Sequence, residues 1–313
     1  MRRFGLYLSL QHPEDRDPRE LVAERLELVT LVREAGFDSV FCGQHFLVPP
    51  DVQMLQPVPV LGRIAAEAGR MTIGTGILIT TLLNPVEVAE NAATLAAIAP
   101  GRFVLGAGVG YRPEENAAFG VERGRIAAFE GKLRVVRQLL DGEEVTASGP
   151  GYRLDGASLT LRPVPRPELW VAATTEAGIE RAASLGDAWL AAPSARVSEI
   201  RRGREVLTAR LGHEPAELPA LREAVVAPTH AEAVALAGPF LDPRGTSSAG
   251  RVSLEPGRYI VGGPGEAAGE LEALFEAGVD HVIFRVQRPG ISYRQAIRTI
   301  ELLASDVIPS VAG

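Results

Sequence analysis

The sequence predicts a (β/α)8 TIM barrel, and two observations carry the prediction. Short apolar runs bounded by glycine, as expected of parallel strands covered on both faces, alternate almost without a break with segments of helical spacing. The 313 residues also suit one barrel, so we expect a single domain over 1–313. The rival architecture, a doubly wound open sheet, would rarely need eight evenly spaced parallel strands.

The elements follow the chain in regular order. Strands are expected at residues 4–9, 38–42, 71–79, 103–107, 169–173, 187–192, 221–227 and 279–286. Helices are expected at residues 18–36, 57–69, 84–98, 124–140, 176–185, 194–211, 231–241, 265–277 and 293–304. Pro18 and Pro85 stand at the starts of their helices, where proline is favoured.

Two irregular stretches read as insertions, after strands four and seven. Residues 141–167 are rich in glycine and proline, and 145–147 with 158–161 are expected to form a hairpin outside the main sheet. Residues 242–258 are polar and contain closely spaced Gly and Ser. A loop of this length in a compact domain is usually a lid or a disordered insertion.

Composition excludes several classes of partner. The net charge of −7 argues against nucleic acids and anionic membranes. The lone cysteine, Cys42, lies in an apolar run and reads as a buried residue, and its isolation fits a reducing cytoplasm. The apolar start is too short for a signal peptide, and no apolar run is long enough to span a membrane. Of the 32 basic residues only Lys132 is lysine, which we attribute to genomic base composition.

Candidate site residues stand where strands end, because ligands of barrels bind at the carboxyl ends. His45 follows the second strand and could move protons or bind a ligand carbonyl, or else be a loop histidine satisfied by backbone. The glycines at the carboxyl end of the fourth strand would let backbone approach a flat or phosphorylated ligand, or merely make a tight turn. They are Gly106, Gly108 and Gly110.

Thr174 and Thr175 open the helix after the fifth strand. Free backbone N–H groups there favour an anion, although an ordinary N-cap gives the same pattern. The histidines show no metal-ligand spacing, so no metal site is expected. Neither a nucleophile motif nor a carboxylate pair for acid–base work is visible, which suits an enzyme whose cofactor does the difficult chemistry.

Four segments carry a resemblance to a known family: residues 71–95, 101–121, 169–190 and 277–290. Through them the chain resembles, nearly end to end, the bacterial luciferase-like flavin-dependent monooxygenases. The resemblance implies a barrel that uses reduced FMN and O₂ to oxidise a small organic substrate. It also implies a separate flavin reductase and a homodimer.

The resemblance assigns roles to individual residues. It places the flavin phosphate at Ala173, Thr174, Thr175 and Ala177, and the flavin ring at Thr75, Gly76 and Ile77 with a cis peptide between the last two. Asn84 falls at a polar pocket position, and Gly108 falls where luciferases carry a cysteine near the flavin. Either Gln44 or His45 matches the active-site histidine, while the pocket would be bounded by Tyr111, Arg112 and Arg285.

Two alternatives keep the barrel. Some relatives use the deazaflavin F420 for hydride transfer, and such a site would need extra cationic groups for the acidic tail of that cofactor. Other members of the family bind flavin without catalysis. The shape of the substrate pocket is expected to depend on the loops 43–56 and 242–258.

Overall fold

The eight main strands form a closed parallel barrel, as predicted. The computed structural model describes the whole chain except residues 14, 242–256, 289 and 312–313. The strands are β1 (Arg3–Tyr7), β3 (Ser39–Cys42), β5 (Thr72–Thr75), β6 (Phe103–Ala107), β9 (Glu168–Ala173), β10 (Ala188–Ala191), β11 (Pro219–Val226) and β13 (His281–Arg285). They pair in the order β10-β9-β6-β5-β3-β1-β13-β11, and the β10–β11 pairing at Ala191 and Ala220 closes the ring.

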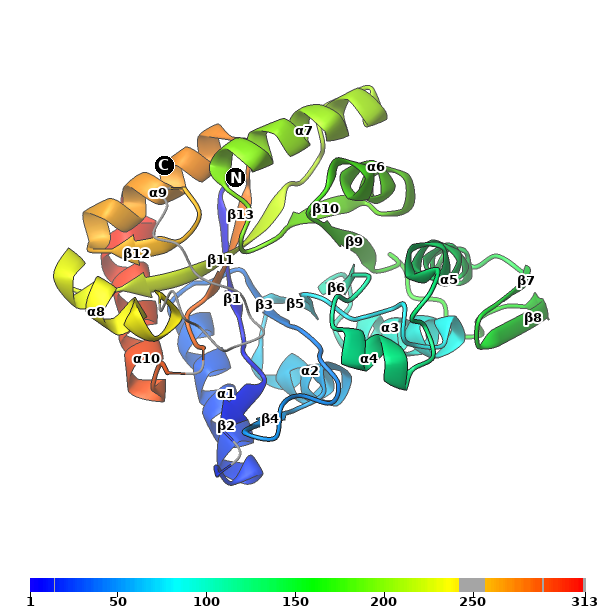
Figure 1. The fold of residues 1–313 in the computed structure, drawn as a ribbon, viewed down its shortest axis with the longest axis horizontal. Helices are drawn as coiled ribbons and strands as arrows, with labels where there is room; N and C mark the ends of the chain where they lie inside the picture. The colour runs from blue at the N-terminus through cyan, green and yellow to red at the C-terminus, as the bar shows by residue number, and fades with distance from the viewer. Residues whose placement is uncertain (14, 242–256, 289, 312–313) are drawn as a thin grey trace.

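Helices surround the barrel (Figure 1). They are α1 (Pro18–Glu34), α2 (Pro57–Glu67), α3 (Pro85–Ile98), α5 (Arg125–Leu140), α6 (Glu176–Leu185), α7 (Val197–Leu211), α8 (His230–Leu241), α9 (Pro264–Glu276) and α10 (Tyr293–Leu302). A π-helical turn, η1 (Leu303–Val307), leads into α11 (Ile308–Val311). Proline begins α1, α2, α3 and α9, because its fixed φ suits the first helical turn. Among the described residues, no helix is both long enough and apolar enough to cross a bilayer.

Large side chains fill the interior of the barrel. Phe41 stacks on Trp170 with 5.1 Å between ring centroids, and both pack with Leu190, Leu221 and Ile283. This packing makes the barrel a solid core, so a ligand can enter only at its mouth. Cys42 is fully buried, as expected, and burial raises the pKa of its thiol.

Several small elements were not predicted. The strands β2 (Gln11–Pro13) and β4 (Val52–Met54) pair with each other in segments expected to be loops. The short helix α4 (Pro113–Ala118) follows β6, and β12 (Ile260–Gly262) extends the sheet beside β11. The third barrel strand ends at Thr75 instead of continuing to residue 79, and beyond it Leu78 forms an isolated parallel bridge to Ala107.

The first insertion is a hairpin at the edge of the molecule beside α5 (Figure 1). Its strands are β7 (Val145–Gly149) and β8 (Tyr152–Ala157), so the expected second strand at 158–161 was wrong. The chain reverses at Pro150 and Gly151, whose φ of 80° suits glycine, and pairing resumes at once. Most of the second insertion, predicted as a lid at 242–258, lies outside the described residues.

Candidate functional site

The floor of the barrel mouth is built by Tyr7, at the end of β1. Its ring packs against the interior cluster, and the Arg285 guanidinium carbon lies 5.6 Å from the ring centroid. Arg285 donates through Nε and Nη2 to both oxygens of Glu223, at 3.1 and 3.0 Å. Burial raises the pKa of Tyr7 to about 12, so the phenol stays protonated at neutral pH and can donate a hydrogen bond.

His45 forms a pair with a buried carboxylate. Its Nδ1–H donates to Glu115 Oε1 at 3.0 Å, and the same oxygen accepts the Phe46 N–H at 2.7 Å. The Glu115 side chain is 1% exposed. On its other side, the His45 ring meets Tyr111 edge-on at 5.5 Å, with Nε2 3.5 Å from the phenol oxygen.

This pairing fixes the chemistry available to His45. Burial lowers the pKa of the imidazole, and Glu115 opposes that shift without cancelling it. The ring is therefore neutral at neutral pH, with its proton held on Nδ1 by the carboxylate. Nε2 faces the Tyr111 hydroxyl and can accept a proton from it or from a bound molecule.

The sequence analysis singled out no carboxylate at the mouth, and the structure places two there: Glu115 beside His45 and Glu223 beside Arg285. Glu115 lies on α4, which the sequence analysis missed. The signal was present, because Pro113 followed by Glu114 and Glu115 is typical of a helix start. Its burial beside His45 depends on the contact between α4 and the segment that follows β3, which no local sequence pattern encodes.

Of the predicted ring-binding residues, Thr75 ends β5, while Gly76 and Ile77 begin the largely buried loop that follows it, residues 76–83. The Gly76-Ile77 peptide is cis, as the resemblance implied. Thr75 Oγ1 donates to the Gly106 carbonyl at 2.7 Å, so Thr75 ties β5 to β6. A Cβ on Gly108 would lie 2.7 Å from Ile77 Cδ1, which shows that this glycine lets the two turns touch.

Two predicted site residues are engaged in structural contacts. Gln44 Oε1 accepts the Ile79 N–H at 3.1 Å, and Gln44 Nε2 donates to Gln56 at 3.0 Å. Asn84 caps α3 by accepting the Val86 N–H at 2.9 Å. Its amide also donates to the Gly151 carbonyl at the tip of the hairpin, at 3.2 Å.

The predicted phosphate site stands at the amino end of α6. Thr175 is the N-cap, and its Oγ1 accepts the Gly178 N–H at 3.2 Å. Thr174, Thr175 and Ala177 are exposed, while the Ala173 carbonyl accepts the Trp189 indole N–H at 3.0 Å. The first-turn N–H groups of a helix have no helical acceptors, so exposed threonines and N–H groups here form a donor set that fits one phosphate.

An apolar wall stands on the α4 side of the mouth. Phe46 and Ile77 pack against the buried cluster of Ile79, Leu82 and Val121, and the Phe46 ring lies 4.7 Å from that of Phe119. Arg112 holds this wall by donating to the carbonyls of Phe46 and Leu47, at 2.9 and 3.2 Å. The wall limits water on one side of the mouth.

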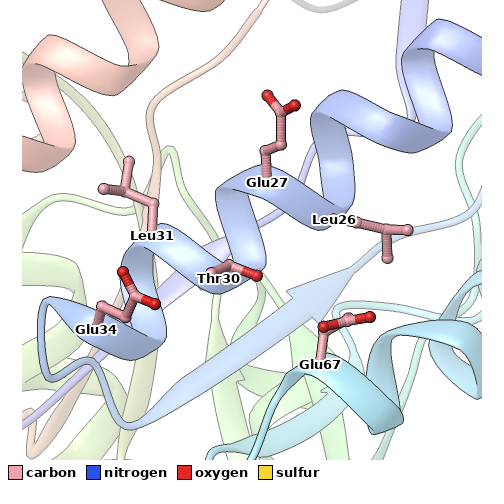
Figure 2. A pocket seen from close by; sticks show the side chains of 6 residues that line it. All are labelled: Leu26, Glu27, Thr30, Leu31, Glu34 and Glu67. Atoms are coloured by element: carbon pink, nitrogen blue, oxygen red, sulfur yellow. The ribbon is translucent and has the colours of Figure 1, made fainter.

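A separate groove lies on the outer surface between α1 and α2, and Figure 2 shows its lining. The lining is Leu26, Glu27, Thr30, Leu31, Glu34 and Glu67. These residues belong to the carboxyl-terminal halves of the two helices, toward the end of the barrel opposite the mouth. The groove is therefore not part of the candidate site.

Within the described ranges, no three His, Cys, Asp or Glu side chains gather as metal ligands would.

Comparisons with known proteins match residues 1–281 to the luciferase-like monooxygenase family. An F420-dependent glucose-6-phosphate dehydrogenase of Beutenbergia cavernae is 35% identical over 214 residues, which are 66% of this chain and 58% of that protein. A 4-hydroxyprotoasukamycin monooxygenase of Streptomyces nodosus subsp. asukaensis is 31% identical over 165 residues, 51% of this chain and 43% of that protein. The match to the first curated relatives thus spans little more than half of their length.

Solved structures share the fold over nearly the full length. Monooxygenase RslO1 from Streptomyces bottropensis superposes with a TM-score of 0.86 at 24% identity, covering 98% of this chain and 99% of the other. An F420-dependent secondary alcohol dehydrogenase, solved with an F420-acetone adduct, gives a TM-score of 0.80 at 22% identity and covers 99% of each chain. The family model matches most of the chain, and the relatives of the chain are oxidoreductases. The chain therefore belongs to the luciferase-like monooxygenase family.

Proposed function

We propose that the chain is a flavin-dependent monooxygenase that uses reduced FMN and O₂ to oxidise a small organic substrate. When bound, reduced FMN would supply the electrons that let one oxygen atom enter the substrate while the other leaves as water. The proposal includes a separate flavin reductase as electron source and a homodimer as the assembly.

The observation that carries FMN is the donor set at the start of α6. It offers hydroxyl and N–H donors that suit a single phosphate. Arg202 of α7 lies nearby, but it is already paired with Glu176 in the first turn of α6, with its Nε 2.6 Å from Glu176 Oε1. An acidic tail such as that of F420 would call for cations beyond this pair, so the local charge favours FMN.

The remaining residues divide the work at the mouth. Thr75, Gly76 and Ile77 would lie against the flavin ring, with Gly108 behind them. His45, oriented by Glu115, would accept or return a proton through Nε2, and Tyr7 would donate a hydrogen bond from the floor. Phe46 and its apolar neighbours would keep water from the reacting atoms.

A second candidate is F420-dependent hydride transfer, which the curated relatives favour. The His45–Glu115 pair suits it as well, because oxidation of an alcohol requires a base for the hydroxyl proton. In this reading the same helix start binds the phosphate nearest the ring, and the acidic tail extends beyond it.

Binding measurements separate the two candidates. Purified protein is titrated with FMN, riboflavin and F420 by fluorescence, and with reduced FMN under anaerobic conditions before O₂ is admitted. We expect reduced FMN to bind more tightly than F420, and oxygen uptake by the complex to depend on substrate. Tighter binding of F420, with no reaction with O₂, would establish the hydride-transfer candidate instead. Flavin binding without either reaction would indicate a non-catalytic flavin protein.

A further inference from the structure

The loop 76–83 is buried, so its backbone polar groups need partners within the protein. Leu78, Ile79, Thr80 and Thr81 are each at most 2% exposed. The carbonyls from 77 to 80 accept backbone N–H groups, from Gln44 at 3.0 Å, Gly108 at 3.0 Å, Leu82 at 3.0 Å and Leu83 at 3.3 Å in turn. The carbonyl of Thr81 instead accepts a side-chain donor.

That donor is Lys132 of α5, whose Nζ lies 2.7 Å from the Thr81 oxygen. The lysine is 5% exposed, and burial lowers the pKa of its ammonium. The hydroxyls of Thr80 and Thr81 are buried without hydrogen-bond partners among the described residues. Lys132 therefore supplies the polar contact between this part of the loop and the helix layer.

The identity of the residue is informative, because every other basic residue of the chain is arginine. The chain has one lysine, and that lysine stands at a buried position. Lysine carries a compact ammonium on a slender stem, whereas arginine carries a wide planar fork. A site that must reach one carbonyl through a packed layer suits the former.

The loop is thus held from two sides. Gln44 binds the Ile79 N–H from the barrel side, and Lys132 binds the Thr81 carbonyl from the helix side. Between β5 and these contacts lies the Gly76-Ile77 peptide, which the proposed function places against the flavin ring.

We propose that Lys132 is a positioning residue for the cofactor: its ammonium holds the 76–83 loop so that Gly76 and Ile77 face the ring. The identity of the ring rests on the proposed function, but the anchoring of the loop does not. Lys132 itself lies in the helix layer and acts through the Thr81 carbonyl.

The test replaces Lys132 by methionine, which keeps an unbranched buried side chain but removes the donor and the charge. The variant leaves the buried Thr81 carbonyl without its donor, so we expect a small fall in melting temperature while the fold is kept. Hydrogen exchange of a peptide covering 76–83, and the FMN dissociation constant, should each rise by at least about tenfold. Arg134→Met, an exposed change in the same helix, serves as control and should alter neither quantity.

The single lysine gives a second measurement on the unmodified protein. After labelling with ¹⁵N-lysine, the side chain gives one ammonium signal, which we expect to be protected from exchange and to shift when FMN is added. Wild-type exchange and wild-type FMN affinity in Lys132→Met would overturn the inference, as would an ammonium signal that exchanges like an exposed amine. If the wild type binds no FMN, the proposed function fails, while the exchange experiment still decides the role of Lys132.

Discussion

Glu115 influences the protonation of His45 through a single hydrogen bond to the imidazole. The carboxylate is buried, accepts both the imidazole N–H and a backbone N–H, and lies 3.5 Å from Arg112 Nη1. Its negative charge favours the imidazolium, whereas burial disfavours it more strongly. The balance leaves a neutral histidine with a fixed tautomer.

Replacing the carboxylate should shift this balance in a defined direction. In Glu115→Gln the favourable charge is lost while burial remains, so the pKa of His45 should fall further below 6.5. The pH dependence of the His45 ring signals in NMR measures this shift. Glu114→Gln, one residue away on the exposed side of α4, should leave the pKa of His45 in place. A rise in the pKa after Glu115→Gln would contradict the pairing.

The sequence identified part of the site for clear physical reasons. His45 could be selected because few histidines follow a strand at the mouth. Gln44 and Asn84 were proposed through the family resemblance, and the structure gives both of them backbone partners. Glu115 and Lys132 were overlooked, because a charged residue on a helix reads as exposed unless the contact of two distant segments buries it.

At the scale of elements, the approach of β5 to β6 depends on glycine. A Cβ on Gly106 would overlap the carbonyl oxygen of Thr75, which is backbone and cannot move aside. Gly106→Ala should therefore lower the free energy of unfolding by about 3 kcal/mol or more. Gly62→Ala is the matched control, because Gly62 lies inside α2 with nothing near its Cβ position. It should raise stability by about 0.5–1 kcal/mol, and urea unfolding measures both changes.

The amino end of α6 gives a prediction that separates its capping role from a phosphate role. Thr175→Ala removes the cap of α6 and should cost about 1 kcal/mol of stability, whatever the ligand. If the same hydroxyl also contacts the phosphate, the variant should lose FMN affinity and keep riboflavin affinity. Equal losses for FMN and riboflavin would leave Thr175 as a helix cap only.

The order of elements was predictable because the periodicity of buried strands and amphipathic helices repeats along the chain. The elements that were missed are short. A three-residue strand such as β4 has too few residues for a pattern, and it exists because β2 offers it a partner. The second strand of the hairpin was predicted too late in the chain, because the apolar run at 158–161 was taken as a strand. Pro150-Gly151 is the stronger signal, since it marks the turn after which β8 begins.

At the scale of the whole molecule, the two ends of the barrel differ in chemistry. The mouth gathers His45, Tyr7 and Arg285, whereas the amino ends of the strands carry residues of structural character. There His281 shares a 2.7 Å hydrogen bond with Ser39 and packs edge-on against Phe41 and Trp170. Burial lowers the pKa of His281 to about 3, and that of His12 to about 3 as well.

These buried neutral histidines should make the protein sensitive to mild acid. In the unfolded chain both titrate near 6.5, so below that pH the unfolded state binds more protons than the folded state. Their effect is absent above pH 6.5, and stability falls as the pH drops from 6.5 toward 3. Each histidine contributes a slope of up to about 1.4 kcal/mol per pH unit.

In the interval from pH 6.5 to 5 carboxylates remain largely ionised in both states, so the slope there comes mainly from histidines of lowered pKa, His45 included. Urea unfolding across the interval should show a slope that His281→Gln reduces by about 1 kcal/mol per pH unit. His213→Gln, at an exposed histidine, should leave the slope of the wild type. An unchanged slope in His281→Gln would mean that His281 is protonated in the folded barrel. The buried hydrogen bond to Ser39 would then have to join an imidazolium to the hydroxyl, with the second ring N–H enclosed among apolar residues. Burial of an unpaired charge at that depth is what the low pKa of His281 argues against.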